Sequence, residues 1–302
     1  MRLYALELNN DIRGERSRRW AMEQMIARLD DPDLVVLPEL AMSGYLADES
    51  VWQYADLHGQ RTAAWAREMA AKYRTAIGVG YLETDGRDFY NAYLIADANC
   101  VYGSVRKSEG ESYLFKRGKF GHVIPTAFGN VAVGICYDSR RRQFYEDIKN
   151  RELSLILLPH GAPADPKKAD GERKTVDRLC NTYLRTFGVP VVYVNSVGAM
   201  PHMLGRTGKM MERSGFAMNG GSTIFSPGGR LLPDCPEGVL GLEWDPVSRK
   251  RRGSIRFHGE DLLPGNTLFR RLILPRDIAD GVEFYEAHKD AALRKLRERS
   301  TE

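Results

Sequence analysis

Short apolar runs alternate with amphipathic helical patterns along most of the chain, and this alternation constrains the fold more than any other feature. Runs of about four to eight apolar residues that end at polar or turn residues are typical of buried strands. The segments between them carry apolar residues at helical spacing, as in Met22, Met25, Ile26 and Leu29. Alternation of this kind predicts an α/β fold.

The pattern predicts both kinds of element over most of the sequence. Strands are expected at 3–8, 34–37, 76–82, 90–96, 101–105, 130–135, 153–158, 191–195, 221–225 and 231–232, and helices at 16–29, 62–73, 143–150, 174–187 and 277–299. Some neighbouring strands resemble hairpins, so we expect mixed rather than purely parallel sheets. No break in composition divides the chain. We therefore expect one domain over 1–275, followed by an amphipathic helix over 276–302 that packs on the body or on a partner subunit.

Composition favours a globular protein of the cytoplasm. Hydrophobic residues make up 43% of the 302 residues, enough for a sizeable core, and the net charge of +4 is too small to suggest a nucleic-acid partner. No segment has the length of a signal or a membrane span, so no membrane partner is expected. The four cysteines are widely separated, which is typical of a reducing compartment and gives no support to a metal site. We expect no cofactor.

Three residues of complementary chemistry each stand at the end of a strand-like segment. They are Glu39, Lys107 and Cys136. Each alone has an ordinary explanation, since a lone cysteine is usually inert packing and a lone charged residue is usually solvated. Ligand clefts in α/β proteins lie at the carboxyl ends of strands, so the three together predict one catalytic site. The remaining cysteines, Cys100, Cys180 and Cys235, are interpreted as inert.

The chemistry of these three side chains fits nucleophilic catalysis. A thiol with an ordinary pKa of about 8.5 is mostly protonated at neutral pH and needs a base or a positive neighbour. Glu39 can accept the thiol proton. Lys107 can favour the thiolate and stabilise the oxyanion of a tetrahedral intermediate, with the backbone N–H of Tyr137 as a second donor.

The motifs around the three residues form an ordered set. Segments 38–40 (Pro-Glu-Leu), 105–107 (Val-Arg-Lys) and 134–138 (Gly-Ile-Cys-Tyr-Asp) carry them, and segments 90–92, 195–198 and 220–229 add further motifs. Together they resemble the nitrilase superfamily of carbon–nitrogen hydrolases, with its Glu-Lys-Cys triad, over roughly residues 1–245. The resemblance implies a four-layer α-β-β-α sandwich with two mixed sheets. It also implies a homodimer or higher homo-oligomer.

A second glutamate follows the lysine in many members of this superfamily. Segment 111–118 matches the family pattern E-x-x-x-F-x-x-G, which by resemblance makes Glu111 a residue that positions the substrate and orients Glu39 and Lys107. Glu109 is nearer to Lys107 but lacks the flanking pattern. A solvated loop carboxylate remains the alternative interpretation of Glu111.

The resemblance implies hydrolysis of a non-peptide carbon–nitrogen bond through a cysteine thioester, with release of ammonia. True nitrilases tend to carry Trp-Glu after the cysteine, whereas this chain carries Tyr137-Asp138. We therefore expect an amidase or N-carbamoyl amide hydrolase that acts on a small-molecule amide. A nitrilase acting on a small organic nitrile, or a non-catalytic binding protein on the same fold, is the alternative.

The chain leaves the family pattern just after Lys107 and again after Asp138, where the resemblance does not assign the residues that surround the substrate. Candidates to line the pocket are Tyr45, Tyr137, Arg140, Arg141, His160 and Arg173. An arginine there would suit a substrate that bears a carboxylate. Placement of these arginines on the surface or at an interface is an equal alternative.

Other assignments are less favoured. A cysteine protease would pair Cys136 with a histidine, and only His160 has a comparable place after a strand. Membrane acyltransferases of the superfamily need transmembrane segments, and its ammonia-supplying domains are fused to a synthetase, so we expect neither. Segment 205–209 is too short for a phosphate-binding loop.

Overall fold

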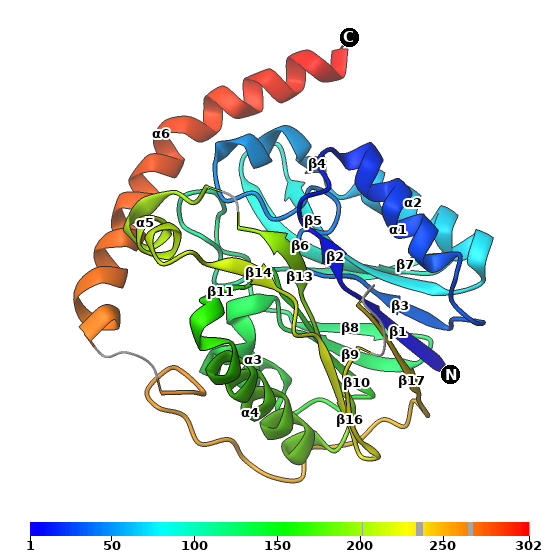
Figure 1. Ribbon diagram of the computed structural model, residues 1–302. Helices are drawn as coiled ribbons and strands as arrows, with labels where there is room; N and C mark the ends of the chain where they lie inside the picture. The colour runs from blue at the N-terminus through cyan, green and yellow to red at the C-terminus, as the bar shows by residue number, and fades with distance from the viewer. Residues whose placement is uncertain (201, 234–237, 265–267, 302) are drawn as a thin grey trace.

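The computed structural model describes residues 1–200, 202–233, 238–264 and 268–301. Two large β-sheets lie face to face, and helices cover their outer faces (Figure 1). The four-layer α-β-β-α sandwich with mixed sheets, expected from the sequence, is confirmed. Among the described residues, the helices are all too short or too polar to cross a lipid bilayer.

The first sheet has seven strands in the order β17-β1-β3-β5-β6-β7, with β4 paired to β5. Its strands are β1 (Arg2–Leu6), β3 (Leu34–Val36), β4 (Asp56–Leu57), β5 (Ala76–Thr84), β6 (Phe89–Ala96), β7 (Val101–Arg106) and β17 (Val239–Glu243). Strands β1, β3 and β5 run parallel, whereas β6, β7 and β17 pair antiparallel. Helices α1 (Glu15–Ile26) and α2 (Gln60–Tyr73) cover its outer face.

The second sheet has six strands in the order β16-β15-β12-β10-β9-β8. They are β8 (Val123–Thr126), β9 (Gly129–Val133), β10 (Leu155–Pro159), β12 (Val191–Val194), β15 (Thr223–Ser226) and β16 (Gly229–Leu231). Strands β9, β10 and β12 run parallel in its centre. Helices α3 (Arg142–Ile148) and α4 (Ala169–Phe187) cover the face turned away from the first sheet.

The main core lies between the two sheets. Val36 of β3, Val133 of β9 and Leu157 of β10 are among its fully buried members. Their neighbours along each strand, such as Val35, face the helices and are buried as well. Because both faces of these central strands are covered, the strands appear in the sequence as continuous apolar runs rather than alternating ones.

A small third sheet closes one end of the sandwich and was not expected from the sequence. Its order is β11-β14-β13-β2, with β2 (Leu8–Asn9), β11 (Pro163–Ala164), β13 (Ser196–Ala199) and β14 (Ala217–Asn219). Between β13 and β14 lies helix α5 (Gly205–Arg213), which was also not expected. Strands of two to four residues carry too little periodicity to be recognised in a sequence. The strand predicted at 3–8 is divided in the structure into β1, which ends at Leu6, and β2.

The last helix, α6 (Leu274–Thr301), follows a single π-helical turn, η4 (Phe269–Ile273), and runs along the outside of the body (Figure 1). Tyr285 and Leu293 are its buried apolar side chains, in a cluster with Trp52 and Phe89. Tyr285 accepts a hydrogen bond from the backbone N–H of Phe89 at 2.9 Å. The helix therefore packs on the turn that joins β5 to β6.

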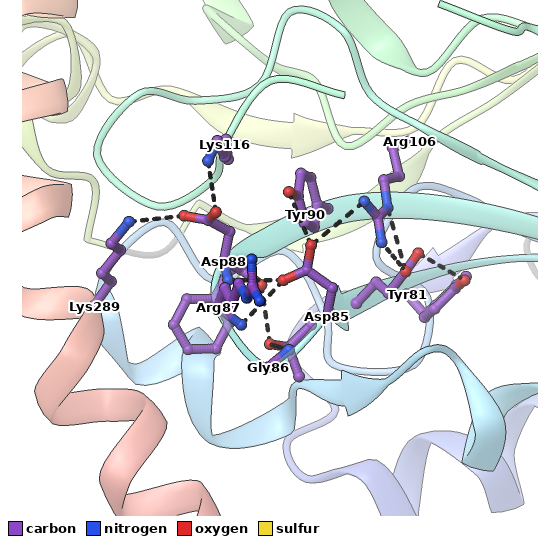
Figure 2. A network of polar contacts seen from close by, with 12 residues as sticks. Tyr81, Asp85, Gly86, Arg87, Asp88, Tyr90, Arg106, Lys116 and Lys289 are labelled. Atoms are coloured by element: carbon purple, nitrogen blue, oxygen red, sulfur yellow. Dashed lines mark hydrogen bonds and ion pairs between the residues drawn. The ribbon is translucent and has the colours of Figure 1, made fainter. Parts of the chain in front are cut away.

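Charged side chains fasten α6 to the same turn. Lys289 of α6 and Lys116 approach the carboxylate of Asp88, at 2.9 Å and 2.6 Å (Figure 2). Tyr285 donates a further hydrogen bond to this carboxylate at 3.2 Å. Asp88 is buried, so these contacts are shielded from solvent more than surface ion pairs are.

Candidate active site

The ends of strands β3, β7 and β9 bring Glu39, Lys107 and Cys136 to one place. Lys107 Nζ lies 2.7 Å from Glu39 Oε1 and 2.6 Å from Glu111 Oε1. The side chains of Glu39 and Lys107 have 0% exposure and that of Glu111 has 21%, so the lysine joins a fully buried carboxylate to a partly exposed one. The Cys136 thiol interacts electrostatically with all three of these charged groups.

Glu39 is held by contacts from three other segments. Asn91 of β6 donates a hydrogen bond to Glu39 Oε1 at 2.7 Å, and the backbone N–H of Gly161 donates to Glu39 Oε2 at 2.6 Å. A side chain at Gly80 would place its Cβ 2.8 Å from the Cα of Glu39, so glycine is needed there for β5 to pass so close. Each carboxylate oxygen therefore has a fixed donor, and the side chain has a single orientation.

The backbone turns sharply at the cysteine. Cys136 has φ +50°, a left-handed conformation that is uncommon for any residue other than glycine. It begins the short 3-10 helix η2 (Cys136–Arg140), in which Ser139 Oγ donates to the carbonyl of Cys136 at 2.6 Å. Cys136, three residues beyond the end of β9, is partly buried against the core between the sheets and lines the cavity described below. The role expected for the N–H of Tyr137, in the first turn of this helix, stays a prediction.

Burial and the neighbouring charges together determine the protonation of the three central groups. It raises the pKa of Glu39, an effect that the charge of Lys107 only partly offsets. Burial alone would lower the pKa of Lys107, but the negative charges of Glu111 and Glu39 outweigh it, so the pKa is raised well above its ordinary value. The pKa of Cys136 is raised by burial and then by the charge of Glu39. The resting thiol is therefore protonated beside a charged lysine.

A buried network behind the site joins the cysteine turn to the segment after the lysine. Asp138 accepts hydrogen bonds from the backbone N–H groups of Ser108 and Glu109, at 3.0 Å and 2.7 Å. His122 lies between Asp138 and Asp147, with Nδ1 2.9 Å from Asp147 Oδ2. Burial alone would lower the pKa of His122, but its bonds to the two aspartates raise it to about 9. The histidine is therefore charged at neutral pH.

A cavity of about 740 Å³ opens beside the thiol. The residues named as substrate contacts from the sequence that line it are Tyr45, Glu111, Tyr137, Arg140, His160 and Arg173. Within the part of the chain that the structure describes, two polar atoms of these residues are buried without a hydrogen-bond partner, Glu111 Oε2 and His160 Nε2. Buried polar atoms usually have partners, so both are available to a ligand.

His160 presents an acceptor to this cavity. Burial lowers the pKa of His160 to about 3, so the ring is neutral. Its Nδ1 lies 2.8 Å from the carbonyl oxygen of Leu158, which assigns the proton to Nδ1 and leaves Nε2 with a lone pair. A neutral histidine oriented by a main-chain carbonyl lacks the carboxylate partner of a protease triad.

The arginines after the cysteine face different ways. Arg140 lines the cavity, and among the described residues its guanidinium has no hydrogen-bond or ion-pair partner. Arg141 instead pairs with Glu109 at 3.1 Å and with Asp261 at 3.0 Å, and Arg142 donates to the carbonyl of Gly259 at 2.7 Å. Arg140 is thus the one of the three that is free to meet an anionic substrate group.

The two glutamates that follow Lys107 have different partners. Glu109 is engaged by Arg141 and Arg117, whereas Glu111 contacts Lys107 and accepts a hydrogen bond from Tyr45 OH at 3.2 Å. Asn91 and Gly161 were not selected from the sequence as contacts of Glu39. A polar Asn91 within an apolar strand was the available signal for the first.

Cys100 and Cys180 lie away from the site. Cys100 is exposed and Cys180 is buried against α3 and the second sheet, while Cys235 lies outside the described residues. Within the described ranges, no group of three histidine, cysteine or acidic side chains is arranged to hold a metal ion.

The chain is similar in sequence to several known proteins. A family model described as carbon-nitrogen hydrolase matches residues 19–257. The glutamine-dependent NAD(+) synthetase of Rhodobacter capsulatus is 25% identical over 224 residues, which are 70% of this chain and 37% of that protein. The chain thus spans little more than a third of that relative. A probable nitrilase of Schizosaccharomyces pombe is 26% identical over 256 residues, 80% of this chain and 86% of that protein.

One solved structure illustrates the similarity of fold. An amidase from Nesterenkonia sp. superposes with a TM-score of 0.62 at 17% identity, over 82% of this chain and 90% of that one.

Proposed function

The chain belongs to the carbon–nitrogen hydrolase family, and on that premise we propose that it hydrolyses a small-molecule amide or N-carbamoyl compound through a thioester on Cys136. The observation that carries the proposal is the buried contact of Lys107 with both Glu39 and Glu111, next to the thiol. In this arrangement a carboxylate provides a base, the lysine a positive charge and the cysteine a nucleophile, all in one place.

The first half of the proposed cycle forms the thioester. The sulfur of Cys136 attacks the amide carbon as the thiol proton passes to Glu39, whose raised pKa makes it a stronger base than an ordinary carboxylate. The carbonyl oxygen gains the negative charge, which Lys107 and the Tyr137 N–H stabilise. When the tetrahedral intermediate collapses, the carbon–nitrogen bond breaks. Glu39 returns the proton to the nitrogen, and ammonia leaves.

The second half releases the acid. Water attacks the thioester carbon while Glu39 accepts one of its protons, and Lys107 again faces the oxyanion. The carbon–sulfur bond then breaks, and the proton on Glu39 restores the thiol of Cys136. Since Glu39 transfers protons in both halves, its exclusion from bulk water, at 1% exposure, supports this role.

The cavity supports a substrate with a carboxylate at some distance from the amide. Arg140 supplies an unpaired guanidinium, which binds carboxylates well. The free acceptors Glu111 Oε2 and His160 Nε2 suit the two N–H groups of a primary amide or carbamoyl group. A nitrile has no N–H to donate, so these acceptors favour an amide over a nitrile.

Ammonia release from a panel of ω-amides, N-carbamoyl amino acids and simple nitriles tests the proposal. We expect release from at least one carboxylate-bearing amide or carbamoyl compound, and none from the Cys136→Ala variant. Cys100→Ala is the matched control, because Cys100 is exposed and outside the site. Turnover of nitriles alone would replace the amidase assignment with a nitrilase. No turnover, with panel compounds binding to the cavity, would leave a binding protein.

A further inference from the structure

Asp277, in the first turn of α6, joins three parts of the molecule. Its side chain accepts hydrogen bonds from the backbone N–H groups of Arg206 and Thr207, at 2.7 Å and 3.1 Å. It also accepts one from Tyr113 OH at 3.3 Å. Asp277 is 7% exposed, so these contacts are inside the fold.

The first two contacts complete helix α5. The residue before α5 is Leu204, which has no side chain able to cap the free N–H groups of the first turn. Asp277 supplies these acceptors from a different helix, and its negative charge is favourable at a helix N-terminus. The start of α5 is therefore fixed by α6.

Helix α5 in turn holds part of the cavity wall. Glu212 of α5 accepts a hydrogen bond from the backbone N–H of Met203 at 3.0 Å. A side chain at Gly208 would clash with the backbone of Met203, so the helix lies directly against it. Met203 and Met211 both line the cavity beside Cys136. A shift of α5 would thus move apolar side chains that face the substrate.

The third hydrogen bond of Asp277, which Tyr113 OH donates, connects α6 to the turn that contains Glu111. The backbone N–H groups of Leu114 and Phe115 both donate to the carbonyl of Glu111 at 2.9 Å, so Tyr113 lies within a closed turn. The ring of Tyr113 in this turn packs against two glycines. A Cβ at Gly205 would lie 2.6 Å from the Tyr113 ring, and one at Gly281 of α6 would lie 2.8 Å from it.

We propose that Asp277 is a positioning residue through which α6 holds both the apolar wall built by α5 and the turn of Glu111, and that it thereby sets the size of substituent that the site accepts. This inference rests on the proposed amide hydrolysis for its meaning in catalysis. Asp277 is hydrogen-bonded to both arms, to α5 through the N–H groups of Arg206 and Thr207 and to the Glu111 turn through Tyr113. A displacement of α6 would then move the apolar wall and Glu111 together.

The experiment compares Asp277→Ala with Asp280→Ala, a matched change on the same helix. Among the described residues, the ion pair of Asp280 is with Arg206, at 3.2 Å, and both side chains are about half exposed. The rate of Cys136 alkylation is measured by peptide mapping with iodoacetamide and with the bulkier N-phenyliodoacetamide. We expect Asp277→Ala to raise the ratio of the bulky to the small rate constant by roughly tenfold, as expected for a loosened wall. Asp280→Ala should leave the ratio unchanged.

Further variants separate positioning from folding. Asp277→Asn keeps the volume and one acceptor oxygen, so it should give an intermediate ratio if Asp277→Ala does not fold. Tyr113→Phe removes only the bond to the Glu111 turn, so it should lower kcat on amides without changing the alkylation ratio. An unchanged ratio in folded Asp277→Ala or Asp277→Asn, with only a lower Tm, would reduce Asp277 to a structural cap. If the unmodified protein hydrolyses no amide, the proposed function fails, and the alkylation ratio still decides the role of Asp277.

Discussion

Asp138 accepts a hydrogen bond from the backbone N–H of Ser108 at 3.0 Å, which ties the cysteine turn to the residue that follows Lys107. The other oxygen of Asp138 binds the next N–H of the same segment, at 2.7 Å. One carboxylate, buried at 1% exposure, therefore sets the spacing of nucleophile and lysine. Neither Asp138 nor Ser108 lines the cavity, yet their hydrogen bond joins the segments that carry Cys136 and Lys107.

Asp138→Asn should disrupt this spacing with little change in volume. An asparagine can accept only one of the two backbone donors with its oxygen, and its NH₂ group would face the other. We expect a loss of stability of about 2 kcal/mol, because a hydrogen bond to a charged group is lost in the interior. We also expect kcat to fall by roughly 100-fold, because small displacements of reacting groups are costly. Urea unfolding and amide turnover measure the two effects. Normal turnover would show that Asp138 does not control the spacing.

The stability of the protein should fall as the pH rises from about 6.5 through about 9. His122 has its pKa raised from 6.5 in a free side chain to about 9 in the fold, so the folded state holds its proton more tightly. This contribution is fully present below pH 6.5, and it is lost as the pH rises through 9. Its size is on the order of 3 kcal/mol. Free energies of unfolding between pH 6 and 10 measure it, and His122→Gln should lack this component. An identical profile in both proteins would contradict the assignment.

Alkylation of Cys136 should depend on Glu39. Because the pKa of Cys136 is raised, the thiol requires a base at the moment of attack rather than an existing thiolate. Glu39→Gln should therefore slow labelling of Cys136 by iodoacetamide by roughly 100-fold, the range of general-base effects. Cys100 is exposed and serves as an internal control in the same sample. Equal labelling of Cys136 in both proteins would remove Glu39 from its role as base.

Gly161→Ala should abolish turnover, whereas Gly171→Ala should not. A Cβ at Gly161 would clash with the Tyr45 ring and lie 3.1 Å from Glu39 Oε2, displacing the N–H that holds this carboxylate. Gly171, within α4, has no atom within 4 Å of such a Cβ. Alanine there should stabilise the helix by about 0.5–1 kcal/mol. Parallel measurement of Tm and turnover distinguishes the two effects. Similar activity of both variants would show that the Gly161 contact is dispensable.

The central strands were predictable because burial on both faces makes them continuous apolar runs. The same property marked Glu39 and Cys136 as strand-end residues, whereas Lys107 follows the edge strand β7, which is only partly buried. The partners of Glu39 could not be found in this way, since Asn91 and Gly161 are 52 and 122 residues away in the chain. Such contacts depend on how strands are ordered in space, and no local pattern encodes that order.

The directions of the side chains that follow Cys136 could likewise not be predicted from the sequence. Arg140 ends the 3-10 helix η2 and Arg142 begins α3, so the change of helix type between them rotates neighbouring arginines apart. Short strands such as β13 and the helix α5 were missed because they are stabilised by tertiary contacts. The contact of α5 with Asp277, about 70 residues later, is an example.

The left-handed backbone at Cys136 has a consequence for evolution and for engineering. A residue with a Cβ in this conformation carries roughly 1–3 kcal/mol of strain, and only glycine would be free of it. A protein that lost its activity could therefore become more stable by exchanging this cysteine for glycine. Under the proposed function, Cys136 is a position at which the chemistry requires a thiol and the backbone conformation favours glycine.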